Sequence, residues 1–342
     1  MSSSHPRPRR GEEVTTETID GDRTVELACS ESVWNAADGA PLAVLWKQPL
    51  EPPTRPSTVV LVHGLRGTRM NWNTSTRSFQ CRLVEAGYAT VCPELRGSGS
   101  SRAAGSPPPR SVLELLELDL LPLLEHVVQR SEHAVRLIGH SLGGILSCLA
   151  AAARPDLVDA VVALASPLSI AMNQPLIRAG ARLWVAFSEA EPFRPLAEGQ
   201  AMSRALMAGR RLIDRLSLPP RVQSSFPGSM EPELQAEFDE NNSREPAFPG
   251  LLRDLSRLAL GRSLEGLSIM DELDRVRAPV LCVAADQDEL APVVAVDALY
   301  QALGSPNKQW LLVEGLGHTD VILGRRAPAL VWDAVIEWLD RD

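Results

Sequence analysis

The sequence has no long apolar run and no excess of positive charge. No stretch approaches the ~20 apolar residues that a membrane-spanning helix needs, so we expect no membrane span. Lys and Arg number 34 against 43 Asp and Glu in a chain of 342 residues, which gives a net charge of −9. Without a basic field to hold a phosphate backbone, the chain is not expected to bind nucleic acid.

Cysteine is scarce and unpaired in the sequence. The five cysteines are Cys29, Cys81, Cys92, Cys148 and Cys282. They stand singly, and none belongs to a C-x-x-C pair. An odd set of this kind indicates neither a disulfide framework nor a zinc site, and we interpret these residues as reduced thiols in apolar strands and helices.

The first residues lack the apolar run of a signal peptide. Residues 1–13 carry Arg7, Arg9 and Arg10, and acidic residues follow where that run would stand. We therefore interpret residues 1–13 as a disordered tail and expect a cytoplasmic protein. Internal repeats with periods of 20 to 50 residues are also lacking, which excludes solenoids and propellers.

What the sequence does contain is a series of apolar runs that alternate with helix-like segments. Residues 24–29 and 42–47 predict two antiparallel edge strands that open the domain, joined by a connection too long for a tight hairpin. Uninterrupted apolar runs are typical of parallel strands covered on both faces. They lie at residues 58–62, 89–93, 135–138, 161–165, 280–284 and 310–313. The alternation predicts an α/β fold with a mostly parallel sheet and crossover helices.

Two intervals between these runs have features of their own. In residues 111–129, Ser111-Val-Leu-Glu114 is a capping box and Asp119 can cap a second helical piece, which predicts a kinked or broken helix. The interval 166–277 is far too long for a crossover. Its helix-like stretches lie at residues 175–188, 200–216 and 251–260. We interpret residues 166–277 as a mostly helical cap inserted into a core domain of residues 14–165 and 278–342.

Ser141 stands in the pattern Gly139-His-Ser-Leu-Gly143, between the strand candidate at 135–138 and a helical run at 145–153. A G-x-S-x-G pattern in this strand-to-helix context is typical of a nucleophile elbow. Its glycines leave room for a tight turn, and the N-terminus of the following helix faces developing negative charge. The sequence therefore predicts Ser141 as a nucleophile.

A serine nucleophile needs a histidine that accepts its proton and an acid that orients the imidazole. Among the six histidines, His318 follows the last predicted strand, at the sheet edge where catalysts of open α/β sheets gather. His140, beside the serine, cannot turn its ring onto Ser141. Asp286 and Asp288 both follow the strand at 280–284 and are both candidates for the acid.

The predicted oxyanion donors are two backbone N–H groups. The first buried strand runs into His63-Gly64-Leu65-Arg66-Gly67, whose glycines allow a backbone N–H to face the serine. We expect the N–H of Leu65 to act together with that of Leu142, the residue after the nucleophile.

Taken together, these motifs resemble the α/β-hydrolase superfamily. They occur in the order usual for that family. In this order they are His63-Gly64, Glu94-Leu-Arg-Gly97-Ser-Gly99, Gly139-His-Ser-Leu-Gly143, Asp288 with Pro292, and Gly317-His318. The resemblance selects Asp288 over Asp286, because Asp288 lies four residues before Pro292. The family usually has Asp where Glu94 stands, in a turn that is structural.

The C-terminal part of the chain carries a second resemblance. Residues 317–328, with the following helix that contains Trp332 and Trp338, are similar to polyhydroxyalkanoate synthases and acid-lipase-like hydrolases. Synthases of that kind place Cys at the elbow, so Ser141 favours a hydrolase over a polymerase.

The residues and the resemblance predict a serine hydrolase that cleaves a small-molecule carboxylic ester with an apolar acyl group through an acyl-enzyme. This chemistry requires no metal and no organic cofactor. In the cap, residues 176–177 and 183–187 are candidates to line the acyl pocket, or else pack against the core. Two alternatives stay open: an acyltransferase or thioesterase with the same triad, and a non-catalytic binding protein on a hydrolase scaffold. An intact set of nucleophile, base, acid and oxyanion loop counts against the second.

Overall fold

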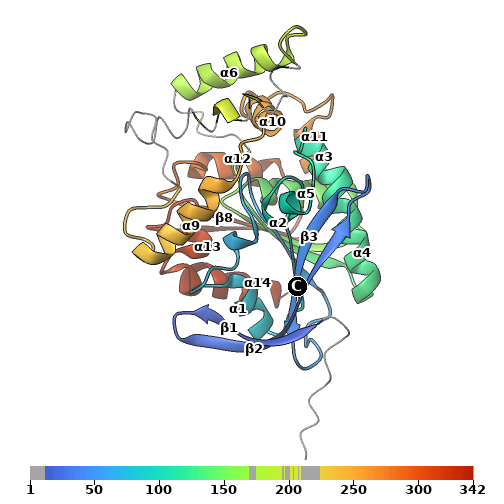
Figure 1. The fold of residues 1–342 in the computed structure, drawn as a ribbon, viewed down its shortest axis with the longest axis vertical. Helices are drawn as coiled ribbons and strands as arrows, with labels where there is room; N and C mark the ends of the chain where they lie inside the picture. The colour runs from blue at the N-terminus through green and yellow to red at the C-terminus, as the bar shows by residue number, and fades with distance from the viewer. Residues whose placement is uncertain are drawn as a thin grey trace, which may run out of the picture.

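The computed structural model describes residues 12–168, 175–194, 196, 201–202, 204–206, 208 and 224–341. Within these residues nine strands form one sheet in the order β1-β2-β3-β5-β4-β6-β7-β8-β9 (Figure 1). β1, β2 and β3 are antiparallel to their neighbours, and the strands from β5 to β9 in this order are parallel. The predicted α/β fold with a mostly parallel sheet is confirmed.

The secondary structure follows the predicted alternation of strands and helices. The strands are β1 (Glu13–Asp20), β2 (Arg23–Asn35), β3 (Pro41–Pro49), β4 (Val59–Val62), β5 (Thr90–Pro93), β6 (Val135–His140), β7 (Val158–Leu164), β8 (Val280–Ala285) and β9 (Lys308–Val313). The helices before β7 are η1 (Arg69–Asn71), α1 (Phe79–Glu85), α2 (Gly99–Ala103), α3 (Val112–Glu114), η2 (Leu115–Leu120), α4 (Leu121–Ser131) and α5 (Leu142–Ala153). Those after β7 are α6 (Pro175–Glu189), α9 (Pro232–Arg244), α10 (Pro249–Ala259), α11 (Ile269–Asp274), α12 (Val293–Ala302), α13 (Asp320–Leu323), η3 (Pro328–Trp332) and α14 (Asp333–Leu339).

The antiparallel edge begins one strand earlier than predicted. Glu13 begins β1, which pairs with β2, so the domain does not open at residue 24 and the tail does not extend to residue 13. Gly21, at φ +56, lies in the two-residue turn that joins β1 and β2 as a tight hairpin. Residues 1–11 of the expected tail lie outside the described residues. β2 and β3 are also longer than predicted, so that only residues 36–40 connect them.

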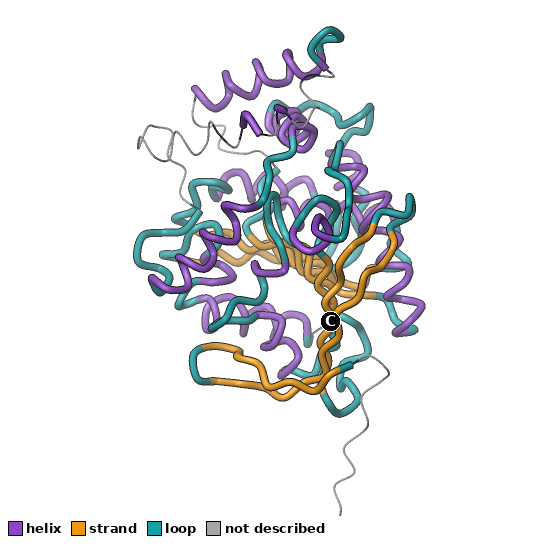
Figure 2. The backbone as a smooth tube through the Cα atoms, viewed as in Figure 1, coloured by secondary structure: helices purple, strands orange, loops and turns teal. Residues whose placement is uncertain are grey.

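Helices cover both faces of the sheet (Figure 2). β4 shows why the apolar runs are uninterrupted. Val60 and Val62 pack into an apolar cluster with α4 and α5, whereas Val59 and Leu61 pack into a second cluster with α1 and α14 on the other face. All four side chains are fully buried, because alternate residues of a strand face opposite sides of the sheet.

The helix after β5 is broken, as predicted. Of the two predicted caps, Ser111 is confirmed and Asp119 is wrong. It runs from α3 through the π-helical segment η2 into α4. Ser111 Oγ accepts from Glu114 N at 3.0 Å and caps the first piece. Asp119 does not cap the second piece. Its carboxylate accepts from Arg96 N, Nε and Nη2 at 2.9, 2.8 and 2.6 Å, and both residues are fully buried.

The described part of the interval 166–277 contains α6, α9, α10 and α11. α6 and α10 match two predicted helices and lie together at one end of the molecule (Figure 1). Most of the predicted helix at 200–216 lies outside the described residues. α9 was not predicted, because its apolar face consists of little more than Leu234 and Phe238. Among the described helices, none has both the length and the apolar character needed to cross a bilayer.

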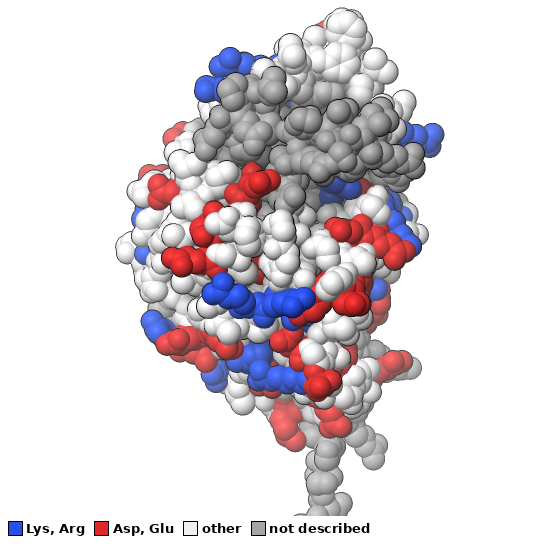
Figure 3. Space-filling view, turned by 90° about the vertical axis from the view of Figure 1, so that its left-hand side faces the viewer, with Lys and Arg blue, Asp and Glu red and all other residues white. Residues whose placement is uncertain are grey.

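Charges of both signs are mixed on the surface. On the face shown in Figure 3, Lys and Arg side chains alternate with Asp and Glu side chains and form no broad basic field. This agrees with the net charge of −9.

The buried Arg96–Asp119 pair gives a stability prediction. We expect Asp119→Ala to lower the free energy of unfolding by about 3 kcal/mol, because it removes the fully buried carboxylate that accepts three hydrogen bonds from Arg96. The guanidinium then keeps Glu114, 3.2 Å from Nη1, and the more exposed Asp38. Urea unfolding followed by circular dichroism measures the loss. The matched control is Asp38→Ala, since Asp38 also binds Arg96 but its side chain is 37% exposed. An equal loss in the two variants would contradict the assignment.

Candidate active site

Ser141 lies in the turn between β6 and α5. Its backbone has φ 55° and ψ −120°, a conformation that non-glycine residues rarely adopt. The turn is held by the neighbouring strand, since Ser141 N donates to Leu164 O at 2.9 Å. Ser141 is the N-cap of α5, and the first N–H groups of a helix have no acceptor within it. The turn therefore presents a half-buried serine at the positive end of a helix dipole.

Two glycines bring the surrounding backbone close to this turn. A Cβ on Gly143 would lie 2.1 Å from Val62 O, so only glycine lets α5 begin against the end of β4. A Cβ on Gly64 would lie 3.0 Å from Ser141 Cβ and 3.6 Å from Ser141 Oγ. The loop after β4 is thus packed directly against the serine.

His318 and Asp288 form a buried pair. His318 Nδ1 donates to Asp288 Oδ2 at 2.8 Å, and Asp288 Oδ1 accepts from Leu290 N and Ala291 N at 2.8 and 2.6 Å. Burial raises the pKa of Asp288, but the charge of His318 and these hydrogen bonds lower it more, so that the pKa lies below its ordinary value. An ionised Asp288 keeps the proton on Nδ1 and leaves Nε2 of His318 for proton exchange.

His140 links this pair to the elbow. Its Nε2 donates to His318 O at 2.9 Å, and the two imidazole rings lie 4.7 Å apart between centroids. Burial, followed by the charge of His318, lowers the pKa of His140 to about 3. His140 is therefore neutral at ordinary pH. Because His140 directly precedes Ser141, its hydrogen bond holds the backbone of His318 beside the elbow.

Asp286 has different partners from Asp288. Its Oδ1 accepts from Gly315 N at 2.6 Å, and its Oδ2 accepts from Gln287 Nε2 at 3.0 Å. Asp286 is exposed, whereas the side chain of Asp288 has no exposed surface. Of the two carboxylates that follow β8, the structure brings Asp288 to His318.

The loop after β4 presents the backbone of Leu65. His63 Nδ1 donates to Gly64 O at 2.9 Å, and His63 Nε2 accepts from Leu95 N at 3.0 Å, which holds the loop to the segment after β5. Gly67 N donates to Gly64 O at 3.0 Å and closes a turn around Leu65. Of the two expected oxyanion donors, Leu65 follows Gly64, which packs against Ser141, and Leu142 is the first residue of α5.

Glu94, where the family usually has Asp, belongs to a buried turn. Its carboxylate accepts from Arg69 N at 3.2 Å and from Ser100 N at 2.7 Å. The longer side chain thus still satisfies backbone donors, and it joins the segment after β5 to the segment after β4.

The cysteines are poor alternatives to Ser141 as a candidate nucleophile. All five are free thiols, as predicted, and four of them are buried. Burial raises the pKa of the Cys92 and Cys148 thiols and raises that of Cys282 to about 12, which suppresses the thiolate form. Within the described residues, no group of three or more His, Cys, Asp or Glu side chains is arranged to hold a metal ion.

The sequence analysis did not identify Asp320, Arg66 or Glu245, which contact the loops of the candidate site or hold a residue that does. Asp320 accepts from Gly317 N at 2.6 Å, next to His318. Arg66, next to Leu65, donates to the backbone oxygens of Asn242 and Glu245. The only sequence signal for Asp320 is its position two residues after His318, and Arg66 and Glu245 meet across the fold without any such signal.

Comparisons with known proteins agree with this architecture. The sequence model described as "Alpha/beta hydrolase family" matches residues 59–334. Similar solved structures include a putative lipase from Acinetobacter baumannii AYE, with a TM-score of 0.57, 20% identity, and coverage of 92% of this chain and 90% of that one. A monoacylglycerol lipase from Paleococcus ferrophilus has a TM-score of 0.57 and 18% identity, with coverage of 92% and 98%. A thermophilic esterase from Thermogutta terrifontis has a TM-score of 0.56 and 17% identity, with coverage of 96% and 98%.

At such identities, the structural neighbours show a shared fold. The family model adds a match to most of the chain, and its range contains the elbow, both carboxylates that follow β8, and His318. The chain belongs to the alpha/beta hydrolase family.

Proposed function

We propose that this protein is a serine hydrolase that cleaves a carboxylic ester with an apolar acyl group through an acyl-enzyme. The observation that carries the proposal is the buried His318 Nδ1–Asp288 Oδ2 hydrogen bond of 2.8 Å, tied through His140 to a strained Ser141 at the start of α5. The lipase and esterase names of the structural neighbours support the same class of substrate.

The proposed reaction uses each group in one role. Ser141 Oγ attacks the ester carbonyl while His318 Nε2 accepts the hydroxyl proton. The N–H groups of Leu65 and Leu142 donate to the oxyanion, and Asp288 stabilises the imidazolium. Collapse of the tetrahedral intermediate expels the alcohol, which takes the proton from His318. Water then repeats the attack on the acyl-enzyme and releases the acid.

In this proposal the insertion at 166–277 is the cap that provides the acyl pocket. The stretch at 183–187 does not line that pocket as a unit, because Leu183 is 73% exposed whereas Val185 is fully buried. Trp184 lies near Phe187, with ring centroids 5.9 Å apart and ring planes tilted by 39°, and this favours packing within the insertion.

Substitution of Ser141 tests its proposed role as the nucleophile. Ser141→Ala should abolish labelling by a fluorophosphonate probe and lower kcat for p-nitrophenyl esters by on the order of 10⁴ or more. Because the turn is held by glycines and backbone hydrogen bonds, the variant should keep its melting temperature. Near-native turnover in a folded variant would refute the role of Ser141, and an unlabelled wild type would favour a non-catalytic protein.

The second prediction distinguishes the two carboxylates. Asp288→Asn should lower kcat by on the order of 10⁴, because an amide in place of the carboxylate favours the wrong imidazole tautomer. Asp286→Asn is the matched control, and its kcat should stay near the wild-type value. Steady-state kinetics of both variants decide the assignment, and the opposite ranking would assign Asp286 as the acid.

The third prediction concerns the acyl group. Burying each methylene of an acyl chain is worth ~0.8 kcal/mol, or about a fourfold gain in kcat/KM. With p-nitrophenyl acetate, butyrate and hexanoate, kcat/KM should rise with chain length until the pocket is full. If acetate is the best substrate, the acyl group is small or polar and the apolar-pocket part of the proposal is wrong.

A further inference from the structure

One segment of the insertion contacts both loops of the candidate site. This segment, which we call the strap, is residues 224–248 and consists of α9 with the residues 224–231 before it and 245–248 after it. Its beginning lies against the loop that carries His318, and its end lies against the loop that carries Leu65. The middle lies across η1.

At its beginning the strap is bonded to the His318 loop by backbone and side-chain groups. Thr319 N and Oγ1 both donate to Ser224 O, at 2.7 and 2.9 Å. Asp320 Oδ2 accepts from Phe226 N at 2.7 Å and from Gly317 N at 2.6 Å. One fully buried carboxylate oxygen therefore joins the strap to the residue before His318.

The approach of the two backbones at this point is tight. A Cβ on Gly317 would lie 2.7 Å from Phe226 N, which leaves no room for another side chain between them. Any displacement of the strap is thus transmitted to Gly317 and to His318 beside it.

At its end the strap is bonded to the loop of Leu65. Arg66 Nε donates to Glu245 O at 3.1 Å, and Arg66 Nη2 donates to Asn242 O at 2.9 Å, where α9 ends. The Glu245 carboxylate in turn accepts from Gly99 N at 3.1 Å and from Arg102 Nη2 at 3.0 Å. A cation at the C-terminus of a helix also interacts favourably with the helix dipole.

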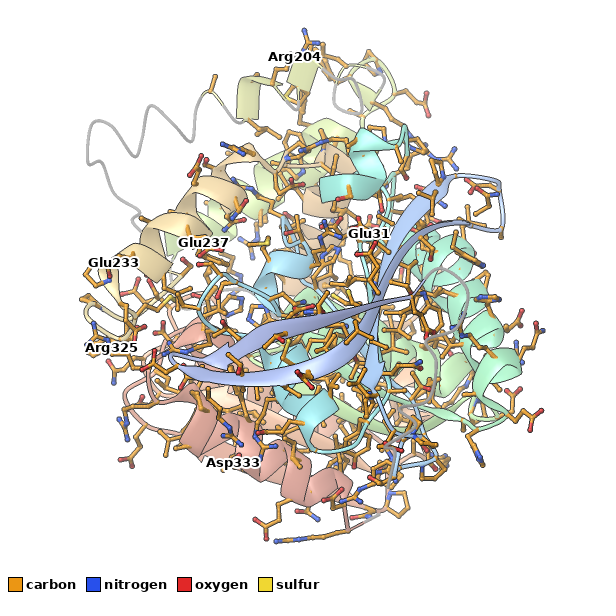
Figure 4. All side chains as sticks on the ribbon, turned by 60° about the horizontal axis from the view of Figure 1, so that its bottom comes forward. Glu31, Arg204, Glu233, Glu237, Arg325 and Asp333 are labelled. Atoms are coloured by element: carbon orange, nitrogen blue, oxygen red, sulfur yellow. The ribbon has the colours of Figure 1, made fainter. Side chains whose placement is uncertain are left out.

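The middle of the strap is firmly packed. Leu234 and Phe238 are buried, with 2% and 4% exposure, in the apolar cluster that contains α14. Glu237 accepts from Ser75 N and Oγ at 2.9 and 2.5 Å. Figure 4 shows Glu237 on α9 and Arg325, on the segment after α13, on the same side of the molecule. Such anchoring makes the strap a fixed element between the two loops.

We propose that the strap belongs to the catalytic frame, and that Asp320 and Arg66 are positioning residues through which it sets the placement of His318 relative to the Leu65 N–H. The inference rests on the proposed function, since it concerns the same base and oxyanion donor. Displacement of a reacting group by about 1 Å can lower the rate 10²-fold. The insertion is accordingly divided: residues 224–248 hold the site together, and only the remaining part acts as a cap.

The test compares two substitutions of Asp320. Asp320→Ala removes the acceptor of both N–H groups, and kcat for p-nitrophenyl butyrate should fall at least about tenfold with a much smaller change in KM. Asp320→Asn keeps one amide oxygen in the same place and should restore most of the lost kcat. Wild-type kcat in folded Asp320→Ala, or no recovery in Asp320→Asn, would overturn the role of Asp320.

A second variant and a matched control cover the other contacts. Arg66→Ala, at a half-exposed position, should lower the rate of fluorophosphonate labelling several-fold. Arg154→Ala is the matched control: it removes the bonds of Arg154 to Glu125 and Asp156 at the end of α5 opposite Ser141, away from the strap and from both loops, so kcat should stay near the wild-type value. If Arg66→Ala labels at the wild-type rate, or if Arg154→Ala loses as much kcat as Asp320→Ala, the positioning role is wrong.

Hydrogen exchange separates this inference from the proposed function. Asp320→Ala should speed amide exchange in the peptides that contain Phe226 and Gly317, and Arg154→Ala should not. This readout needs no activity. Inactive, unlabelled wild-type protein would refute the proposed hydrolase alone. An active wild type whose exchange and kcat are unchanged by Asp320→Ala would refute the strap alone.

Discussion

The site depends on the close approach of α5 to the end of β4. Gly143 lets the first turn of the helix begin against Val62 O, and this contact forces the chain to turn sharply at Ser141. The positive φ of Ser141 is tolerated because Leu164 O accepts the N–H of Ser141 and because the turn is tightly packed at the carboxyl end of the parallel strands. The position of Ser141 and that of the loop after β4 both follow from this one packing constraint.

Two buried hydrogen-bonded pairs show how similar interactions serve different ends. Arg96 and Asp119 are fully buried, and Asp119 accepts three hydrogen bonds from Arg96, so the pair holds the segment after β5 to the broken helix. His318 and Asp288 are paired on one side only, through Nδ1. The ring keeps Nε2 for another partner. A pair whose polar groups are hydrogen-bonded to each other stabilises the fold. A pair in which one imidazole nitrogen is not bonded to the carboxylate is suited to proton transfer.

The insertion is attached unevenly to the domain. α6 contacts α10 and presents Leu183 to solvent, whereas α9 buries Leu234 and Phe238 and joins two loops of the site. An element built into the core by buried side chains and backbone hydrogen bonds opens only at a high free energy, and one that exposes apolar side chains is held more weakly. The strap and α6 therefore have different mechanical roles although they belong to one insertion.

Local pattern was enough to predict most of the sheet and two members of the candidate triad, Ser141 and His318. Buried parallel strands require continuous apolar runs, and the Gly139–Gly143 turn has a strict spacing, so both leave a local signature. β1 was missed although Asp20-Gly21 indicates a hairpin, because its strand is half exposed and has few apolar residues. α9 was missed for the same reason.

Contacts between distant segments were decided only by the tertiary structure. From the residues alone, Asp286 and Asp288 were equal candidates, and only the resemblance to the family separated them. In the fold, Asp288 turns inward to His318 and Asp286 turns outward to Gly315. Asp119 has the sequence position of a cap but binds Arg96, and Asp320 joins Phe226 to Gly317. Except for the local bond between Gly317 and Asp320, these pairings join residues 23 to 94 positions apart. A sequence pattern specifies which residues are buried without specifying which buried groups meet.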